Sequence, residues 1–141
     1  MNEELGKWNR LIKRQDELYH KCARRSGLTD AQFWVLYAVC EEDQLLCQNT
    51  FCENWCYSKQ TVSTAVSGLE KTGLIQLSYA KGSKKQKDIT LTKDGEIFCD
   101  KYIRSLQAAE EKVLKSLSKN ERDAFFNTLE SLQVRLENEL L

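Results

Sequence analysis

The sequence predicts a mainly α-helical fold with a small β-hairpin, and three observations support this prediction. Apolar residues recur at helical spacing over most of the 141 residues. The chain contains no proline, a residue that would interrupt helices. Between residues 75 and 91 the apolar period changes from about 3.6 to 2, as expected for two short strands.

Length and composition predict one globular domain over residues 1–141. Hydrophobic residues make up 41% of the chain and charged residues 30%, which is typical of soluble proteins. The longest apolar run, Phe33–Cys40, is far shorter than the roughly 20 residues that span a bilayer. The N-terminal segment lacks the apolar core of a signal peptide. We therefore expect a cytoplasmic protein without a membrane partner, whose six cysteines form no disulfide framework.

The first two helices are expected over residues 4–24 and 30–42. Gly27 is suited to end the first helix, and Thr29 is suited to cap the second. Together with Gln32, Thr29 fits the capping-box pattern. The apolar run inside residues 30–42 would fit a strand in isolation, but the cap and the length favour a buried helix.

Two further helices should follow. A short one is expected over residues 47–56, and Ser58 is placed to cap the next, which Gly73 would end. The small residues Ala65 and Gly68 predict that another element packs closely against this fourth helix.

The period-2 segment predicts a two-stranded hairpin with a long basic tip. Its alternating apolar positions are Ile75, Leu77, Tyr79, Ile89 and Leu91. A fifth helix is expected over residues 93–116, with Thr92 as its cap. A sixth begins at a capping box formed by Ser118 and Glu121.

The order of two helices, a short helix, a turn, a helix and a hairpin is that of a winged helix-turn-helix, expected over residues 28–92. The fourth helix should be its recognition helix, because its exposed face carries short neutral or basic side chains. Such side chains offer hydrogen bonds to base edges in the DNA major groove without repelling phosphates. The residues expected to face DNA are Ser58, Lys59, Gln60, Thr61, Ser63, Thr64 and Ser67.

The distribution of charge favours the same partner, double-stranded DNA. Residues 56–93 contain seven Lys or Arg and two Asp or Glu, although the whole chain has no net charge. Four lysines in the hairpin tip are expected to contact phosphates. They are Lys81, Lys84, Lys85 and Lys87. A lysine loop that only faces solvent is the alternative for the tip considered alone.

Three motifs resemble the MarR family of bacterial transcriptional regulators. They are "LTDAQFWVL" from Leu28, "SKQTVSTAVSGLEKTGLI" from Ser58 and "DITLTKDGE" from Asp88. The resemblance implies a homodimer on a pseudo-palindromic operator, in which residues 1–27 and 93–141 form the dimerisation part. It favours a repressor that a small ligand releases.

The residues expected in the dimer interface lie on the first and last helices. They are Leu5, Trp8, Ile12, Phe125, Leu129, Leu132, Leu136 and Leu140.

The sequence departs from the family pattern in the wing and at its cysteines. The wing usually carries Asp, Arg and Arg where this chain has Ser83, Lys84 and Lys85. Lysine cannot form the bidentate fork of arginine, so we expect a looser wing contact. At Cys52 and Cys56 the family more often has Ala and Gly.

Two alternatives remain open for the cysteines. Cys47, Cys52 and Cys56, with Cys22 and Cys40 as further candidates, could form a thiol- or metal-sensing site. Cys52 and Cys56 would lie one helical turn apart on the same face. The other alternative is that the cysteines are small apolar residues in a reduced cytosol.

Four aromatic residues could line a cavity for a small aromatic ligand, as the resemblance suggests, or simply belong to the core. They are Trp8, Phe33, Trp34 and Tyr37. No acid–base or nucleophile constellation is visible, so we expect no enzyme, no cofactor and no metal site. The runner-up function is a winged helix whose basic hairpin binds an acidic protein.

Overall fold

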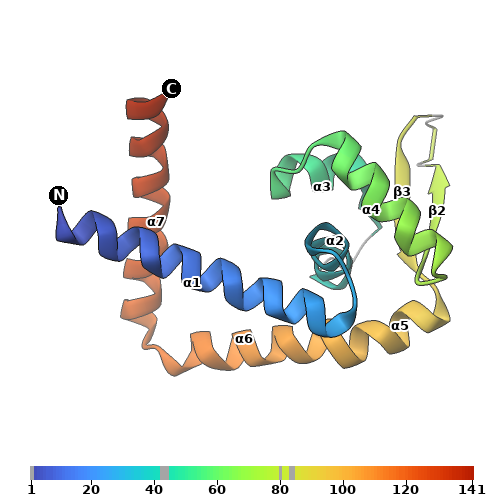
Figure 1. Ribbon diagram of the computed structural model, residues 1–141, viewed down its shortest axis with the longest axis horizontal. Coiled ribbons are helices and arrows are strands. Elements are labelled where there is room, and N and C mark those ends of the chain that lie inside the picture. The colour runs from blue at the N-terminus through green and yellow to red at the C-terminus, as the bar shows by residue number, and fades with distance from the viewer. Residues whose placement is uncertain (1, 42–44, 80, 83–84) are drawn as a thin grey trace. The chain divides into compact units, whose positions relative to one another are not determined.

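The computed structural model describes residues 2–41, 45–79, 81–82 and 85–141 (Figure 1). The chain forms two compact units, Met1–Ser105 and Leu106–Leu141, called here the N-terminal and the C-terminal unit. The elements are α1 (Glu3–Ser26), α2 (Asp30–Glu41), β1 (Leu46–Cys47), α3 (Gln48–Trp55), α4 (Lys59–Lys71), β2 (Ile75–Tyr79), β3 (Lys87–Leu91), α5 (Lys93–Cys99), the π-helical turn η1 (Asp100–Arg104), α6 (Ser105–Ser116) and α7 (Lys119–Leu140). This mainly α-helical fold with a small sheet confirms the predicted class.

Side-chain and glycine caps fix the boundary between α1 and α2, as predicted. Gly27 ends α1 in the left-handed conformation, with φ 77°, and its N–H donates to the carbonyls of Ala23 and Arg24. The Gln32 N–H donates to Thr29 Oγ1 over 3.2 Å, and the Thr29 N–H donates to Gln32 Oε1 over 3.1 Å. The capping box is therefore present, and it sets where α2 begins.

The sheet has three strands in the order β1-β3-β2, not the two that were predicted. The expected hairpin forms with Ile75 opposite Leu91 and Tyr79 opposite Lys87. The additional strand β1 pairs with the outer side of β3, where Leu46 lies opposite Ile89. A strand of two residues is too short to produce an alternating pattern, so periodicity could not reveal it.

The core of the N-terminal unit lies between α2, α4 and the sheet. Its largest fully buried side chains are Phe33, Phe51, Leu36, Leu69, Ile75, Ile89 and Ile103. Helix α2 packs against α4, and the crossing is close at Gly68. A Cβ atom there would lie 2.5 Å from Nε2 of the flexible Gln32 side chain, so α2 packs closely against α4 at this point, as predicted.

Thr92 joins the end of the sheet to α5. Its hydroxyl accepts from the Gly95 N–H over 3.0 Å and donates to the Gly73 carbonyl over 2.5 Å, while its own N–H donates to the Leu74 carbonyl over 3.1 Å. Gly95 is buried against the same Leu74 carbonyl, where a Cβ atom would overlap with it. The helix expected over residues 93–116 is present, and the π-helical turn η1 within it was not predicted.

The C-terminal unit contains most of α6 and the whole of α7. The Ser118 hydroxyl accepts from the Glu121 N–H, and the Glu121 carboxylate accepts from the Ser118 N–H, each over 3.1 Å, which confirms the second capping box. Neither helix has a buried residue. The apolar seam of α7 is therefore exposed in the single chain.

Candidate nucleic-acid interface

Helix α4 is capped at its start and apolar on its inner face. The Ser58 hydroxyl accepts from the Thr61 N–H over 3.1 Å and donates to Thr61 Oγ1 over 2.9 Å. The cap predicted at Ser58 is therefore present. The buried side chains of α4 are Val62, Ala65, Val66 and Leu69. This stripe fixes the rotation of the helix on α2, and so decides which residues face outward.

The outward face of α4 carries the side chains that were predicted to face DNA. All seven of them, Ser58, Lys59, Gln60, Thr61, Ser63, Thr64 and Ser67, are exposed. Thr64 donates its hydroxyl proton to the Gln60 carbonyl over 3.0 Å, so its oxygen keeps lone pairs for an outside donor. The hydroxyl groups of Ser58 and Thr61 already take part in the hydrogen bonds of the cap.

Electrostatically, the outward face of α4 is neutral to basic. Lys59 stands in its first turn, where the unpaired N–H groups and the helix dipole also favour an anion. The single acidic residue of α4, Glu70, lies in the last turn. A phosphate near the start of this helix would therefore meet no opposing carboxylate from α4.

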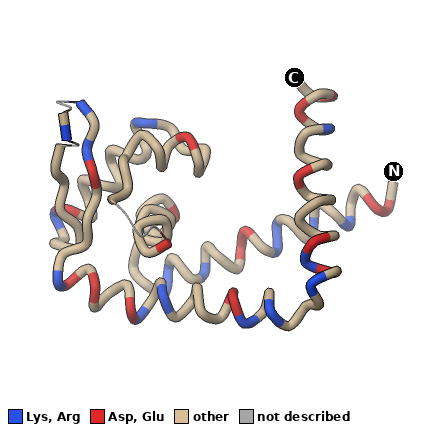
Figure 2. The backbone as a smooth tube through the Cα atoms, turned by 180° about the vertical axis from the view of Figure 1, so that it is seen from behind, with Lys and Arg blue, Asp and Glu red and all other residues tan. Residues whose placement is uncertain are grey.

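The hairpin places further lysines beside α4, as Figure 2 shows. Lys81, Lys85 and Lys87 are exposed, and Lys84 lies outside the described residues, as does Ser83. The Lys87 Nζ lies 5.9 Å from the centre of the Tyr79 ring on the neighbouring strand. This distance suits a cation–π contact that keeps the ammonium group at the sheet surface.

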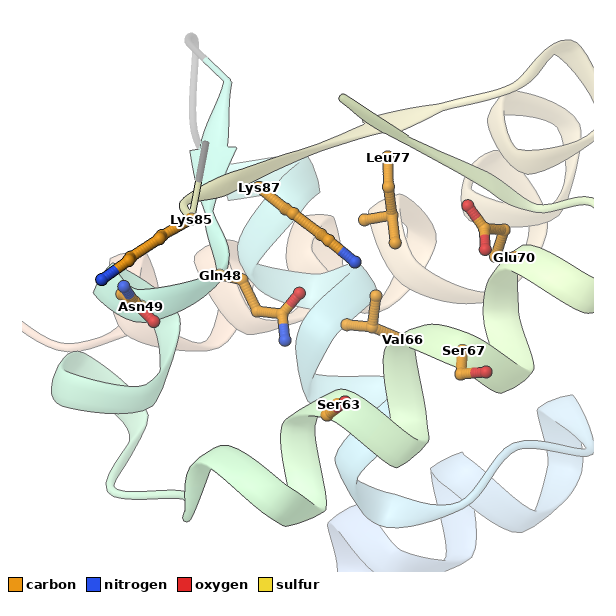
Figure 3. A pocket seen from close by; sticks show the side chains of 9 residues that line it. All are labelled: Gln48, Asn49, Ser63, Val66, Ser67, Glu70, Leu77, Lys85 and Lys87. Atoms are coloured by element: carbon orange, nitrogen blue, oxygen red, sulfur yellow. The ribbon is translucent and has the colours of Figure 1, made fainter. Parts of the chain in front are cut away.

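A pocket of about 280 Å³ lies between α3, α4 and the hairpin (Figure 3). Its lining combines predicted residues with others that the sequence did not indicate, and consists of Gln48, Asn49, Ser63, Val66, Ser67, Glu70, Leu77, Lys85 and Lys87. Ser63 and Ser67 of α4 are thus brought together with Lys85 and Lys87 of the hairpin.

Gln48 and Asn49 are the polar residues that sequence reasoning missed. They open α3 directly after the short strand β1, and their amide groups line the same pocket as the lysines. The pairing of β1 with β3 places these two residues beside the pocket. No local pattern in the sequence could have indicated this position.

The three cysteines proposed as a sensing site occupy different environments. Cys47 lies in β1, and Cys52 is buried in α3, where burial raises the pKa of its thiol. Cys56 is exposed and follows the end of α3 with φ 55°. The expectation that Cys52 and Cys56 share one helical face was therefore wrong, because the chain leaves the helix before Cys56. A raised pKa disfavours the reactive thiolate at Cys52.

The aromatic residues of α2 pack with aromatic residues of neighbouring elements. The ring of Trp34 stacks on Trp55 with centroids 5.2 Å apart, and it also lies 5.0 Å from Tyr19 and 5.2 Å from Tyr37. Phe33 is fully buried, and Trp8 is half-buried on α1. The rings of Tyr19, Tyr37 and Trp55 thus occupy much of the space around Trp34.

The described part of the chain contains neither a metal-binding cluster nor a membrane-spanning helix. Among residues 2–41, 45–79, 81–82 and 85–141, no three His, Cys, Asp or Glu side chains are grouped so as to hold a metal ion. No helix of the same residues is both long and apolar enough to cross a membrane.

A model of the MarR family matches residues 26–84. NMB1585, a MarR family regulator from Neisseria meningitidis, superposes with a TM-score of 0.81 at 24% identity, covering 99% of this chain and 97% of that one. No curated protein matches the sequence.

Several of the similar structures contain DNA. A protein described as a MarR family transcriptional regulator from Listeria monocytogenes, complexed with a 26mer DNA, has a TM-score of 0.74 at 23% identity, covering 99% of this chain and 92% of that chain. The S. aureus MepR–DNA complex has a TM-score of 0.72 at 18% identity, covering 96% and 98%. This chain therefore has the fold of MarR-family transcriptional regulators, and its residues 26–84 carry the sequence pattern of that family.

Proposed function

We propose that this protein is a MarR-family transcriptional regulator that binds double-stranded DNA as a homodimer. One observation carries the proposal. A helix capped by Ser58 presents an exposed face of hydroxyl, amide and lysine side chains beside a hairpin that carries further lysines. An unconstrained surface helix would more often carry Glu–Lys pairs four residues apart.

In the proposed complex, α4 enters the major groove and the hairpin follows the phosphate backbone. Gln60, Ser63 and Ser67 supply donors and acceptors to base edges. Lys59 contacts a phosphate near the start of α4, and Lys85 and Lys87 contact phosphates from the hairpin. The two DNA-containing structures named above, which share this fold, support this use of it.

A homodimer is proposed because apolar side chains remain uncovered on both ends of the chain. On α7, Phe125 is 51% exposed, Leu129 44% and Leu140 75%. On α1, Leu5 and Ile12 are also exposed. Monomeric proteins rarely leave so many large apolar side chains in contact with water. Two winged helices related by a two-fold axis would bind the two half-sites of a pseudo-palindromic operator.

We further propose that the protein is a repressor and that a small aromatic ligand releases it. A dimer covering an operator excludes other proteins from that DNA. The ring cluster around Trp34 and Trp55 supports the choice of an aromatic ligand, because both indoles are half-buried and an aromatic ring would extend the stack that they form with each other.

The DNA proposal is tested by fluorescence anisotropy with the DNA upstream of the protein's own gene and a scrambled fragment. Binding is measured across salt concentrations for the wild type and for Lys85→Ala/Lys87→Ala. Each phosphate contact that is lost should reduce the slope of log affinity against log salt by about 1. Lys112→Ala, which removes an exposed lysine from α6, is the matched control and should leave the slope unchanged.

The outcome separates the proposal from its main alternative. Tight binding to the upstream fragment alone, with a smaller slope in the double variant, supports a sequence-specific regulator. Equally weak binding to both fragments, with no effect of the lysines, would instead favour a winged helix that binds an acidic protein.

A further inference from the structure

Helix α1 carries an exposed stripe of regularly spaced cations. Lys7, Arg14 and Lys21 follow one another at intervals of seven residues, and all three side chains are exposed. Seven residues are close to two helical turns, so the three charges lie on one face and about 10.5 Å apart along the axis. Leu11 and Leu18, which are 50% and 59% exposed, repeat at the same interval beside them. These residues are called the basic stripe of α1.

The basic stripe has no acidic partner among the residues that the structure describes. A groove of about 880 Å³ runs along α1, and every residue that lines it belongs to α1 itself. Neither Arg14 nor Lys21 takes part in an ion pair with another described residue. The neighbouring Glu17 has its Oε1 atom 3.6 Å from Arg24 Nη2. At about 100° per residue, Arg14 lies on the opposite side of α1 from Leu5, so the stripe differs from the apolar surface expected in the dimer interface.

Helix α7 carries the complementary pattern of charge. Asp123, Glu130 and Glu137 follow one another at the same interval of seven residues, and all three are exposed. Phe126 and Val134, which are 44% and 56% exposed, lie beside them. Asp123 has an ion-pair partner on its own helix, whereas Glu130 and Glu137 have none among the described residues. These residues are called the acidic stripe of α7, and they lie roughly 120° around the helix from its apolar seam.

Helices α1 and α7 also differ in the sign of their total charge. Helix α1 contains seven Lys or Arg and four Asp or Glu, whereas α7 contains three and five. Because the charges of both stripes repeat at one interval, two such helices laid side by side bring each cation near a carboxylate. Charge and spacing therefore make the acidic stripe a fitting partner for the basic stripe.

We propose that the basic stripe of α1 packs against the acidic stripe of α7 in a second copy of this chain, and that this contact selects the partner. The inference rests on the proposed homodimer. A two-fold axis repeats the contact, so each dimer contains it twice. The apolar seams of α7 face each other in this arrangement, and the acidic stripes stay available for α1 of the other chain.

The role assigned to the stripes is selection of the partner, not strength of binding. Exposed ion pairs add little affinity, because water and salt screen them. Like charges held face to face, in contrast, oppose association. Burial of the apolar seam therefore supplies most of the affinity, while the stripes exclude chains of the same fold that carry a different charge pattern.

Two charge-reversed variants of the full chain test the inference. Arg14→Glu/Lys21→Glu makes the stripe of α1 acidic, and Glu130→Lys/Glu137→Lys makes the stripe of α7 basic. Each variant alone would bring like charges together in both contacts. Sedimentation velocity at low salt should give dimer dissociation constants at least about tenfold above that of the wild type. In about 1 M salt, which screens charges beyond about 3 Å, the difference should largely disappear.

An equimolar mixture of the two variants gives the sharpest measurement. Each chain then meets a partner of opposite charge in both contacts, so the mixture should form heterodimers, which native mass spectrometry identifies by their mass. Lys71→Glu/Lys93→Glu, which makes the same change of charge at exposed positions outside both helices, is the matched control. It should dimerise like the wild type.

Crosslinking of the wild type adds a measurement that needs no variant. A mixture of isotopically labelled and unlabelled chains is treated with a carbodiimide, which joins an amine to a carboxylate in contact with it. Peptides that join Lys21 of one chain to Glu130 or Glu137 of the other are expected.

A dimeric wild type without such peptides, or reversed variants that dimerise alone as tightly as the wild type, would overturn the inference. Failure of the mixture to form heterodimers would overturn it as well. A wild type that stays monomeric would refute the proposed homodimer itself, and the inference with it.

Discussion

Cys56 shows how one residue can hold an unfavourable backbone conformation at the end of a helix. It is the only described residue other than glycine with a positive φ, 55°, and it follows the last turn of α3. The left-handed conformation costs a residue with a Cβ atom roughly 1–2 kcal/mol, and glycine avoids this cost. The chain therefore carries backbone strain at Cys56.

Replacing Cys56 by glycine should raise the free energy of unfolding by about 0.5–1 kcal/mol, after the greater flexibility of glycine in the unfolded chain is subtracted. Urea denaturation of the reduced proteins measures the difference. Cys56→Ala is the control, since it removes the thiol but keeps the Cβ atom, and it should bring no gain. Equal stabilisation by both changes would show that the backbone is not the cause.

Single residues were predictable from the sequence where their role is local. Thr29, Ser58, Thr92 and Ser118 were each recognised as caps, because the hydroxyl and its N–H partner lie within three residues. The packing of α2 against η1 was not predictable, because it joins elements that lie far apart in the chain.

At the scale of an element, the start of α4 combines a structural and an electrostatic role. Ser58→Ala removes the acceptor for the Thr61 N–H and should cost about 1 kcal/mol of stability. Ser58→Asp keeps a good cap, so its stability should stay close to that of the wild type. Its new charge, however, would face the phosphates and should weaken DNA binding by about tenfold at low salt.

Thermal unfolding and anisotropy on the same preparations separate these two roles. Ser58→Thr, which keeps both the cap and the neutral charge, is the control and should change neither measurement greatly. If Ser58→Asp bound DNA as tightly as the wild type, the start of α4 would not lie near the backbone.

Helix α4 was predictable as an element because its buried apolar stripe and its exposed polar face are both visible in thirteen consecutive residues. The strand β1 and the turn η1 were not, for different reasons. Strand β1 is too short to show alternating apolar residues. The turn η1 keeps the apolar spacing of a helix, while its hydrogen bonds follow the π-helical pattern. Because β1 was missed, Gln48 and Asn49 were missed as part of the candidate interface.

At the scale of the whole molecule, the C-terminal unit should depend on association for its order. Leu132→Asp places a charge in the apolar seam of α7 and should yield monomers at micromolar concentration, with loss of operator binding. Sedimentation velocity measures the association state. Asn138→Asp adds the same charge on the opposite side of α7, given 100° per residue, and should remain dimeric. A stable dimer of Leu132→Asp would contradict the proposed interface.

The connection made by Thr92 bears on where the protein can be divided. Because Thr92 bonds to Gly73, and Gly95 packs on the Leu74 carbonyl, the first turn of α5 forms part of the support of the hairpin. Ile103, within η1, is fully buried in the same unit. A fragment that ends at β3 would therefore lose contacts that support its own hairpin. The shortest independent DNA-binding fragment should extend to about Ser105, where the N-terminal unit ends.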